Sequence, residues 1–415
     1  MAALTAIAAL AASSVAVATP PVRPALPGAS TCDPQTIRCA ALRAGIRWGA
    51  ATSPGELSRD PQAEQLLASE FSAFTPDNDF KPERTQPQPG QFQFAAVDSM
   101  LATARAKKMR IRGHVMFWYA QTPAWMREQV QDRESGLRIM RAHIRGIFEH
   151  VFPNRDLIDQ WDIVNEAFEP DGTMRGTIWR NAIGPDYVEQ AFRIAAEERD
   201  RLNDTVAGTE NDWKLELYYN DFIDDSFVAF DSAIDVSGGL DLGGLAHAGV
   251  GVLAGSGLCV IAPRCAAIKR MAKDFAARGV PMDGIGFQAH IASLAAPDYR
   301  GVTSWIAPLG LRWAVTELDQ PCSTDPLTKW LCFQAQGETF RQITAACVAD
   351  AACDTVVQWG ISDRRSWWTS LVPGGLLGNP LAFDTNLRRK PAANAVYRVL
   401  RDGAQPPSAW LQADQ

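Results

Sequence analysis

The chain has 415 residues and a mass of 45.2 kDa, which suits either two ordinary domains or one large barrel. Hydrophobic residues make up 47% and charged residues 21% of the chain, a globular composition that excludes a disordered, collagen-like or coiled-coil protein. The formal net charge is −7, from 47 acidic and 40 basic residues. An acidic chain is a poor partner for nucleic acid, so sugar, peptide and small-molecule ligands stay open.

The first 18 residues form an apolar segment of mostly small side chains, which ends at Ala16-Val17-Ala18. This ending fits the A-x-A cleavage site of a signal peptide, although no Lys or Arg precedes the apolar run. The alternative is a buried N-terminal helix, but the prolines that follow from Pro20 to Pro27 cannot continue one. We therefore expect a signal peptide at 1–18 and a Pro-rich leader at 19–44. The mature protein would be secreted or periplasmic, with no contact to the membrane after export.

Eight cysteines fall into four neighbouring pairs along the chain, which agrees with export to an oxidising compartment. A structural zinc site would need C-x-x-C doublets or histidines at ligand spacing, and the sequence has neither. We expect no metal site, and we expect disulfides between neighbours in the sequence: Cys32–Cys39, Cys259–Cys265, Cys322–Cys332 and Cys347–Cys353.

Short apolar segments alternate with helical patterns throughout residues 45–402. Strands are expected at 46–50, 72–75, 110–114, 158–164, 215–219, 284–288, 312–316 and 355–359. Helices are expected at 95–108, 137–150, 185–203, 266–278 and 337–348. Eight strands with helical connections predict an α/β protein, a (β/α)8 TIM barrel that forms a single domain. Residues 403–415 would be a short tail.

One interval is longer than a barrel connection needs. Residues 225–265 are rich in glycine and include Gly249-Val250-Gly251, part of a chance match to a dinucleotide-binding fingerprint. No strand leads into this segment and no acidic residue follows a second strand, as that fingerprint requires. We therefore expect a loop insertion and no organic cofactor.

Polar and aromatic residues follow most of the predicted strands, at the C-terminal face where such barrels place their chemistry. In chain order they are Asp77, Asn78 and Lys81; His114, Trp118 and Gln121; Asn165 and Glu166; Gln288 and His290; Glu317 and Asp319; and Trp359 and Trp367. The two-residue period of a strand puts Glu317 and Asp319 on one face. The same period turns Asn165 away from Glu166, so both face the site only where the strand geometry is irregular.

Glu166 and Glu317 follow the fourth and seventh predicted strands, on opposite sides of the barrel mouth. Two carboxyl groups that face a gap are what cleavage of a glycosidic bond requires. The alternative for each is a solvated loop acid or half of a structural ion pair. Because both lie at strand ends among other polar residues, we favour the catalytic interpretation.

Histidine and tryptophan at the same strand ends have two interpretations each. His290 is either a core histidine or a group that orients Glu317 through Asp319. The tryptophans either fill the core, which we favour for Trp368, or stack on the flat apolar face of a sugar. For Trp359 and Trp367 we favour stacking.

Together these motifs resemble glycoside hydrolase family 10, whose typical members are endo-1,4-β-xylanases, over residues 45–400. The matching segments are Thr75-Pro76-Asp77-Asn78, Arg112-Gly113-His114, Gln121-Thr122-Pro123, residues 161–167, Tyr219-Asn220-Asp221, and residues 283–290, 316–319, 359–363, 366–367, 383–384 and 390–392. The resemblance implies a (β/α)8 catalytic domain and a retaining double displacement, with carboxyl groups about 5–5.5 Å apart.

By the same resemblance, Glu166 is the general acid/base, Glu317 is the nucleophile, and Asn165 holds the sugar 2-hydroxyl. Asp319 would support His290, and Asp77 would play a supporting part at the sugar sites. The residues that would line the sugar-binding subsites are Asn78, Lys81, His114, Trp118, Gln121, Gln288, His290, Trp359 and Trp367. No metal or cofactor is implied.

Three positions depart from the family pattern. Where the family usually has Glu, Trp and His, this chain has Asp77, Pro82 and Tyr119. These positions touch the subsites on the non-reducing side of the cleaved bond, so the catalytic pair matches the family more closely than the substrate-binding residues do.

The expected function is that of a secreted retaining endo-1,4-β-xylanase that acts on xylan as a monomer. One alternative keeps the mechanism but takes another β-linked glycan or a plant glycoside as substrate. A second is an inactive carbohydrate-binding protein on the same scaffold. A protease or esterase would need a G-x-S-x-G motif, which the sequence lacks.

Overall fold

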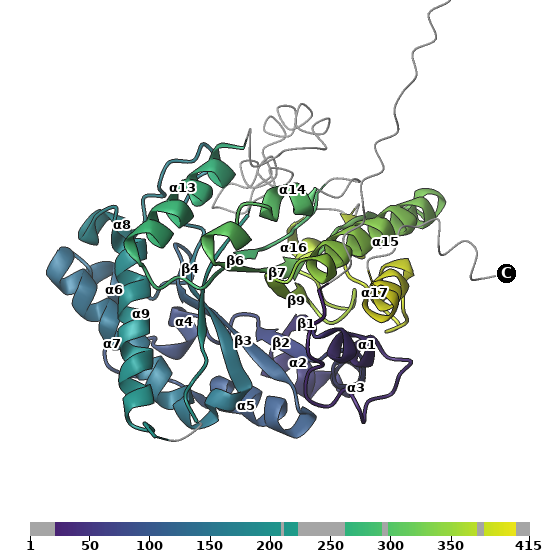
Figure 1. Ribbon diagram of the computed structural model, residues 1–415, viewed down its shortest axis with the longest axis horizontal. Coiled ribbons are helices and arrows are strands. Elements are labelled where there is room, and N and C mark those ends of the chain that lie inside the picture. Colours follow the sequence, from purple (N-terminus) through teal and green to yellow (C-terminus); the bar gives the residue numbers. More distant parts are fainter. Residues whose placement is uncertain (1–20, 209–210, 223–261, 293–297, 372–376, 404–415) are drawn as a thin grey trace, which may run out of the picture.

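The computed structural model describes residues 21–208, 211–222, 262–292, 298–371 and 377–403. Eight parallel strands, each hydrogen-bonded to the next, close into a barrel (Figure 1). They are β1 (Arg47–Thr52), β2 (Ala73–Pro76), β3 (Arg110–Phe117), β4 (Ile158–Asn165), β5 (Glu216–Asp221), β6 (Gly284–Phe287), β7 (Arg312–Leu318) and β9 (Cys353–Gln358). The predicted (β/α)8 barrel is confirmed.

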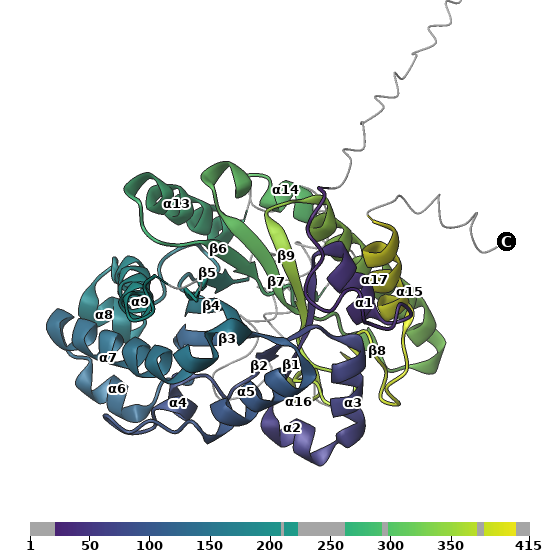
Figure 2. The same ribbon diagram turned by 60° about the horizontal axis from the view of Figure 1, so that its bottom comes forward.

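Helices surround the barrel on its outside (Figure 2). The long ones are α5 (Ala95–Lys107), α7 (Arg133–Val151), α9 (Tyr187–Asp204), α13 (Pro263–Arg278), α15 (Pro326–Ala349) and α17 (Pro391–Asp402). Shorter ones are α1 (Ile37–Ala44), α2 (Pro54–Arg59), α3 (Pro61–Glu70), α4 (Pro82–Thr85), α6 (Ala124–Gln129), α8 (Ile178–Ile183), α14 (Tyr299–Thr303), α16 (Trp368–Leu371), η1 (Phe152–Leu157) and η3 (Ala307–Leu309). A small antiparallel pair, β8 (Cys322–Ser323) and β10 (Leu377–Gly378), lies outside the barrel sheet.

The barrel strands are buried on both faces, as parallel strands covered by helices usually are. Trp48, Trp161 and Trp313 are completely buried. Trp161 also explains Gly113 on the neighbouring strand, because a Cβ at position 113 would lie 2.2 Å from the indole ring. The five predicted helices are all present, and three of them, α7, α13 and α15, begin several residues earlier than expected. Among the described residues, no helix is both long and apolar enough to cross a membrane.

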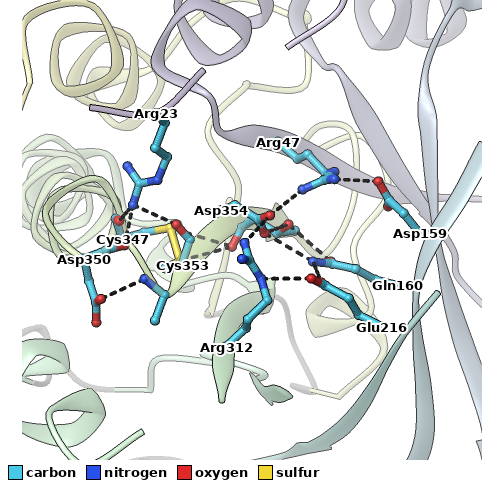
Figure 3. Close-up of polar contacts among 12 residues, drawn as sticks. Arg23, Arg47, Asp159, Gln160, Glu216, Arg312, Cys347, Asp350, Cys353 and Asp354 are labelled. Atoms are coloured by element: carbon cyan, nitrogen blue, oxygen red, sulfur yellow. Dashed lines mark hydrogen bonds and ion pairs between the residues drawn. A yellow bond between two sulfur atoms is a disulfide. The ribbon is translucent and has the colours of Figure 1, made fainter. Parts of the chain in front are cut away.

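The folded domain starts earlier than the predicted boundary at residue 45. Helix α1 packs in the core through Ile37, Ala40 and Ala41. Further upstream, the guanidinium of Arg23 donates hydrogen bonds to carbonyl oxygens of the α15–β9 turn, at 2.8 to 3.0 Å (Figure 3). Most of the predicted leader therefore belongs to the folded domain and packs against the barrel. The predicted signal peptide and the tail from residue 404 lie outside the described residues, as does most of the predicted insertion, whose last residues begin α13.

Charged residues occupy the N-terminal ends of the strands, opposite the end where the predicted site lies (Figure 3). Arg47 of β1 pairs with Asp159 of β4 and with Asp354 of β9. Arg312 of β7 pairs with the same Asp354 and, at 3.1 Å, with Glu216 of β5. Although burial would raise the pKa of Asp354, Arg47 and Arg312 lower it. This network ties together strands from all sides of the barrel, so we assign it a structural role.

Three of the four predicted disulfides are present: Cys32–Cys39, Cys322–Cys332 and Cys347–Cys353. The fourth predicted pair includes Cys259, which lies outside the described residues. Cys32–Cys39 holds the start of α1, Cys322–Cys332 joins β8 to the first turns of α15, and Cys347–Cys353 joins the end of α15 to β9.

Candidate active site

Side chains from the C-terminal ends of β4, β5, β6 and β7 meet in one buried hydrogen-bond network. Glu166 follows β4 directly, and its Oε1 accepts hydrogen bonds from Asn165 Nδ2 at 2.9 Å and from Gln288 Nε2 at 2.8 Å. Glu166 is 5% exposed. Asn165 and Gln288, both predicted from the sequence, therefore bind the Glu166 carboxylate directly.

Regular strand alternation would point the side chains of Asn165 and Glu166 in opposite directions, but the backbone at Glu166 is not extended. Its φ is 55°, in the left-handed region that residues other than glycine rarely adopt. The turn is held by a hydrogen bond from the Glu166 N–H to the carbonyl oxygen of Asn220 at 2.9 Å. Because the chain leaves the extended conformation at this residue, the side chains of Asn165 and Glu166 reach the same network.

Asn220 at the end of β5 connects the two glutamates, and sequence reasoning did not include it in the site. Its Nδ2 donates to Asn165 Oδ1 at 2.9 Å and to Glu317 Oε1 at 2.8 Å. Thr316 Oγ1 donates to Asn220 Oδ1 at 2.7 Å and fixes the orientation of the amide. Asn220 and Asp221 are polar residues at the end of a strand, the same pattern that identified the other site residues, so Asn220 could have been predicted.

Glu317 of β7 lies at the start of a second chain of contacts. His290 Nε2 lies 3.2 Å from Glu317 Oε2, and His290 Nδ1 lies 2.9 Å from Asp319 Oδ1. Trp367 Nε1 donates to the other oxygen of Asp319 at 2.6 Å. Glu317, His290 and Asp319 are all buried, with at most 5% of each residue exposed. The predicted link between His290 and Asp319 is present, and His290 also contacts Glu317 directly.

The two glutamates have opposite tendencies to hold a proton. Burial raises the pKa of Glu166, and the negative charge of Glu317 adds to this. Burial acts in the same direction on Glu317, but the hydrogen bond from His290 and the nearby positive charges overcome it and lower its pKa. One carboxyl group is thus adapted to carry a proton and the other to stay ionised.

Lys81 gathers three more of the predicted residues on the β2 and β3 side of the site. Its Nζ donates to Asn78 Oδ1 and to Gln121 Oε1, both at 2.9 Å, and lies 4.8 Å from the centre of the Trp118 ring. Burial lowers the pKa of Lys81. Its charge acts on both catalytic candidates, because electrostatic interactions with Glu317 and Glu166 oppose that lowering.

His114 is held by two residues that the sequence analysis did not assign to the site. Its Nδ1 lies 2.9 Å from Asp162 Oδ2, and Asp162 forms a buried bidentate pair with Arg112. The rings of Trp359 and His114 form a T-shaped pair, with centres 5.4 Å apart. Because Asp162 and Arg112 lie inside the strands, where side chains usually fill the barrel, their positions alone did not mark them as part of a site.

A pocket of about 340 Å³ adjoins the site at Trp359 and Trp367. The predicted residues Asp77, Trp359 and Trp367 line it, together with Glu56 and Arg365, which were not predicted. Trp359 and Trp367 are partly exposed, whereas Trp368 is completely buried and packs against Phe222. The interpretation of Trp368 as a core residue is confirmed.

Tyr119, one of the departures from the family pattern, lies at the rim of the site and is 38% exposed. The guanidinium of Arg175 stacks 4.2 Å from the centre of its ring. Arg175 Nε also donates to the carbonyl oxygen of Glu166 at 3.2 Å. An exposed aromatic ring is therefore connected through one arginine to the backbone of Glu166.

Comparison with known proteins agrees with this geometry. The chain is 28% identical to endo-1,4-beta-xylanase 2 of Aureobasidium pullulans, over 82% of this chain and 84% of that protein. It is also 28% identical to endo-1,4-beta-xylanase B of Thermotoga neapolitana, over 82% and 85% of the two chains. Native xylanase 10B of Thermotoga maritima superposes with a TM-score of 0.71 and 26% identity, over 89% of this chain and 99% of that one. The profile of Glycosyl hydrolase family 10 matches residues 36–237 and 260–399. The chain belongs to this family and is a glycoside hydrolase.

Proposed function

We propose that the protein is a retaining endo-1,4-β-xylanase in which Glu166 is the general acid/base and Glu317 the nucleophile. The observation that carries the proposal is the opposite direction of the two pKa shifts within one hydrogen-bond network. The substrate class is supported by solved relatives. Xylanase 10B of Thermotoga petrophila was solved with xylobiose, and variants of a Thermoanaerobacterium saccharolyticum xylanase with xylotriose and xylotetraose.

In the first step, Glu317 attacks the anomeric carbon while Glu166 donates its proton to the leaving glycosidic oxygen. The bond between the anomeric carbon and that oxygen breaks, and a glycosyl ester of Glu317 forms. In the second step, Glu166 takes a proton from water, whose oxygen attacks the anomeric carbon and releases Glu317. Two inversions give net retention of configuration.

The remaining network residues prepare these two carboxyl groups. His290, Asn220 and Lys81 stabilise the negative charge of Glu317 before attack. We assign Asn165 to the sugar 2-hydroxyl, because its amide lies between Glu166 and the Asn220 contact to Glu317. Asn78, His114, Trp118, Gln121, Gln288, Trp359 and Trp367 would line the sugar subsites, with Asp77 and Asp319 in support.

We also propose that the enzyme is exported and acts as a monomer. Three disulfides support export, because such bridges persist in oxidising compartments. Cleavage after Ala18 would leave Arg23 and its contacts to the α15–β9 turn in the mature chain. N-terminal sequencing of the secreted protein and light scattering of the purified enzyme test these two statements.

A second candidate function keeps the same mechanism but takes another β-linked glycan or a plant glycoside. The observation that favours it is the altered rim, where Tyr119 stacks on Arg175 and Asp77 lines the pocket beside Trp359. Both positions differ from the residues usual in the family, so they change which hydroxyl groups the site can bind.

The test is release of soluble oligosaccharides from glucuronoxylan by the purified protein, with Glu317→Ala as the blank. We expect rapid release of short xylo-oligomers by the wild type and none by the variant. Proton NMR of the first products distinguishes retention, which gives the β-anomer, from inversion. No release from xylan, together with turnover of another aryl β-glycoside, would favour the second candidate. No turnover at all would overturn both.

A further inference from the structure

The pocket beside the site contains charged groups that the proposed reaction does not use. Glu56 and Arg365 both line it, and neither was predicted from the sequence. The pocket is connected to the nucleophile through its aromatic walls. Trp367 donates to Asp319, and the rings of Trp359 and His290 are nearly perpendicular with centres 6.3 Å apart. A molecule in this pocket would therefore lie next to the sugar that Glu317 attacks.

Glu56 is a buried carboxyl group with an unused acceptor. Its side chain is on α2, directly after β1, and only 9% of the residue is exposed. Oε2 accepts a hydrogen bond from Thr52 Oγ1 at 3.0 Å, but Oε1 accepts none from any residue that the structure describes. Among the described residues Oε1 does not belong to the fully buried atoms without a partner, so it is open to the pocket and can accept a hydrogen bond from a hydroxyl group that enters.

Arg365 complements this acceptor with unused donors. It is exposed, and within the described part of the chain its guanidinium makes no ion pair and no hydrogen bond. The adjacent Arg364 differs, because it pairs with Asp60 at 2.8 Å. The positive charge of Arg365 reaches Glu56, where it opposes the rise in pKa that burial causes. The two groups thus face one cavity without forming a salt bridge to each other.

The combination of partly exposed indole rings with a few unpaired polar groups is typical of a site that binds a sugar. We infer that Glu56, with Arg365, binds the hydroxyl groups of an uncharged sugar residue that lies beyond the one attacked by Glu317. The inference rests on the proposed function and adds a residue that determines specificity. An uncharged sugar is favoured over a uronic acid, because the two carboxyl groups of Glu56 and Asp77 outnumber the one cation of the lining that is unpaired in the described structure, Arg365.

This assignment also accounts for a departure from the family pattern. The chain has Asp77 where the family usually has glutamate, which shortens the acid at this position by one methylene group. Glu56 supplies a second carboxyl group to the same pocket. Two acidic side chains, Glu56 after β1 and Asp77 after β2, would therefore share the hydrogen bonds to the second sugar.

The experiment compares kcat/KM on nitrophenyl β-xyloside, β-xylobioside and β-xylotrioside for the wild type, Glu56→Ala and Glu56→Gln. The isosteric Gln variant keeps the shape of the pocket should the Ala variant fold poorly. Glu64→Ala is the matched control. Glu64 lies on α3, forms an ion pair with Lys107 of α5 at 2.9 Å, and does not line the pocket.

We expect each Glu56 variant to hydrolyse the β-xyloside within about twofold of the wild type, and to lose about tenfold in kcat/KM on the longer glycosides that reach the pocket. Arg365→Ala should show the same dependence on length. An equal loss on all three substrates, or no loss on any, would overturn the inference while the wild-type activity upholds the proposed function. A wild-type enzyme that hydrolyses none of the three would overturn both.

Discussion

His290 lies between two carboxylates, with its Nε2 3.2 Å from Glu317 Oε2 and its Nδ1 2.9 Å from Asp319 Oδ1. Burial alone would lower the pKa of His290, but Asp319 and Glu317 outweigh burial and raise it to about 10. The ring is therefore an imidazolium at neutral pH and donates a hydrogen bond to each acid. Its charge keeps Glu317 ionised in a buried site.

Replacing Asp319 with asparagine should make activity sensitive to pH in the neutral range. Without that negative charge, burial lowers the pKa of His290, and the histidine loses its proton as pH rises through the lowered value. We expect kcat/KM of Asp319→Asn to fall about 10- to 100-fold at pH 8 and less at pH 5. The pH–rate profile and NMR titration of the His290 ring measure this.

Asp274→Asn is the control for this variant, because Asp274 is exposed and pairs only with Arg278 in the described structure. An Asp319→Asn enzyme with a wild-type pH profile would contradict the assigned role of Asp319.

Asn220→Ala should slow the reaction even though Asn220 itself is neither the acid/base nor the nucleophile of the proposed mechanism. The change removes a donor to Glu317 and to Asn165, so we expect kcat/KM to fall about 100-fold and the free energy of unfolding to fall by about 1–3 kcal/mol. Steady-state kinetics and urea denaturation measure the two effects. Thr316→Val is the matched control, because it removes only the contact that orients the Asn220 amide. We expect Thr316→Val to lower kcat/KM less than Asn220→Ala does. A larger fall in kcat/KM for Thr316→Val would contradict the role assigned to Asn220.

Glu198 on α9 should contribute to stability in a pH-dependent way. It is buried and accepts hydrogen bonds from Arg145, Arg201 and Arg141. Although burial raises the pKa of Glu198, these arginines lower it to about 2. Because the folded pKa is depressed, the stabilisation is complete above pH about 4.5 and is lost as pH falls toward 2.

We therefore expect Glu198→Gln to lower the free energy of unfolding by about 2 kcal/mol at pH 7. The difference from the wild type should shrink steadily in urea titrations between pH 4.5 and 2.5. The control is Glu197→Gln. Glu197 is exposed and pairs with Arg141 alone in the described structure, so this change should lower the free energy of unfolding much less. A deficit in Glu198→Gln that does not change with pH would argue against this linkage.

Loss of the Cys347–Cys353 disulfide should affect stability and leave catalysis unchanged. The bridge spans only six residues of sequence separation, so the loop-closure term is small, about 2 kcal/mol. Arg23 bonds the carbonyl oxygens of both cysteines, which keeps the turn in place in the variant. We expect a lower thermal midpoint for the Cys347→Ala/Cys353→Ala protein by calorimetry, with kcat unchanged. A loss of kcat would show that this end of the barrel affects the distant site.

Much of the fold was predictable because it depends on local patterns. Buried parallel strands appear as short apolar segments and helices as longer periodic ones, and every observed barrel strand overlaps a predicted one. The start of the domain was placed too late, because the prolines before residue 28 suggest a leader. Arg23 joins the domain through residues more than 300 positions away, such as Cys347, and α1 packs on the equally distant α17 as well as on β1 and α3.

Composition, hydrophobic period and motifs were enough to predict the barrel, the family and which strand ends hold polar side chains. Which of those side chains meet depends on how the strands are arranged in space. Asn220 joins Asn165 to Glu317, Glu166 turns toward Asn165 through a left-handed backbone, and Glu56 shares a pocket with Arg365. Hydrogen bonds and pKa shifts depend on separations of a few ångströms. Those separations are set by strand register and barrel closure, which act between residues that lie far apart in the chain.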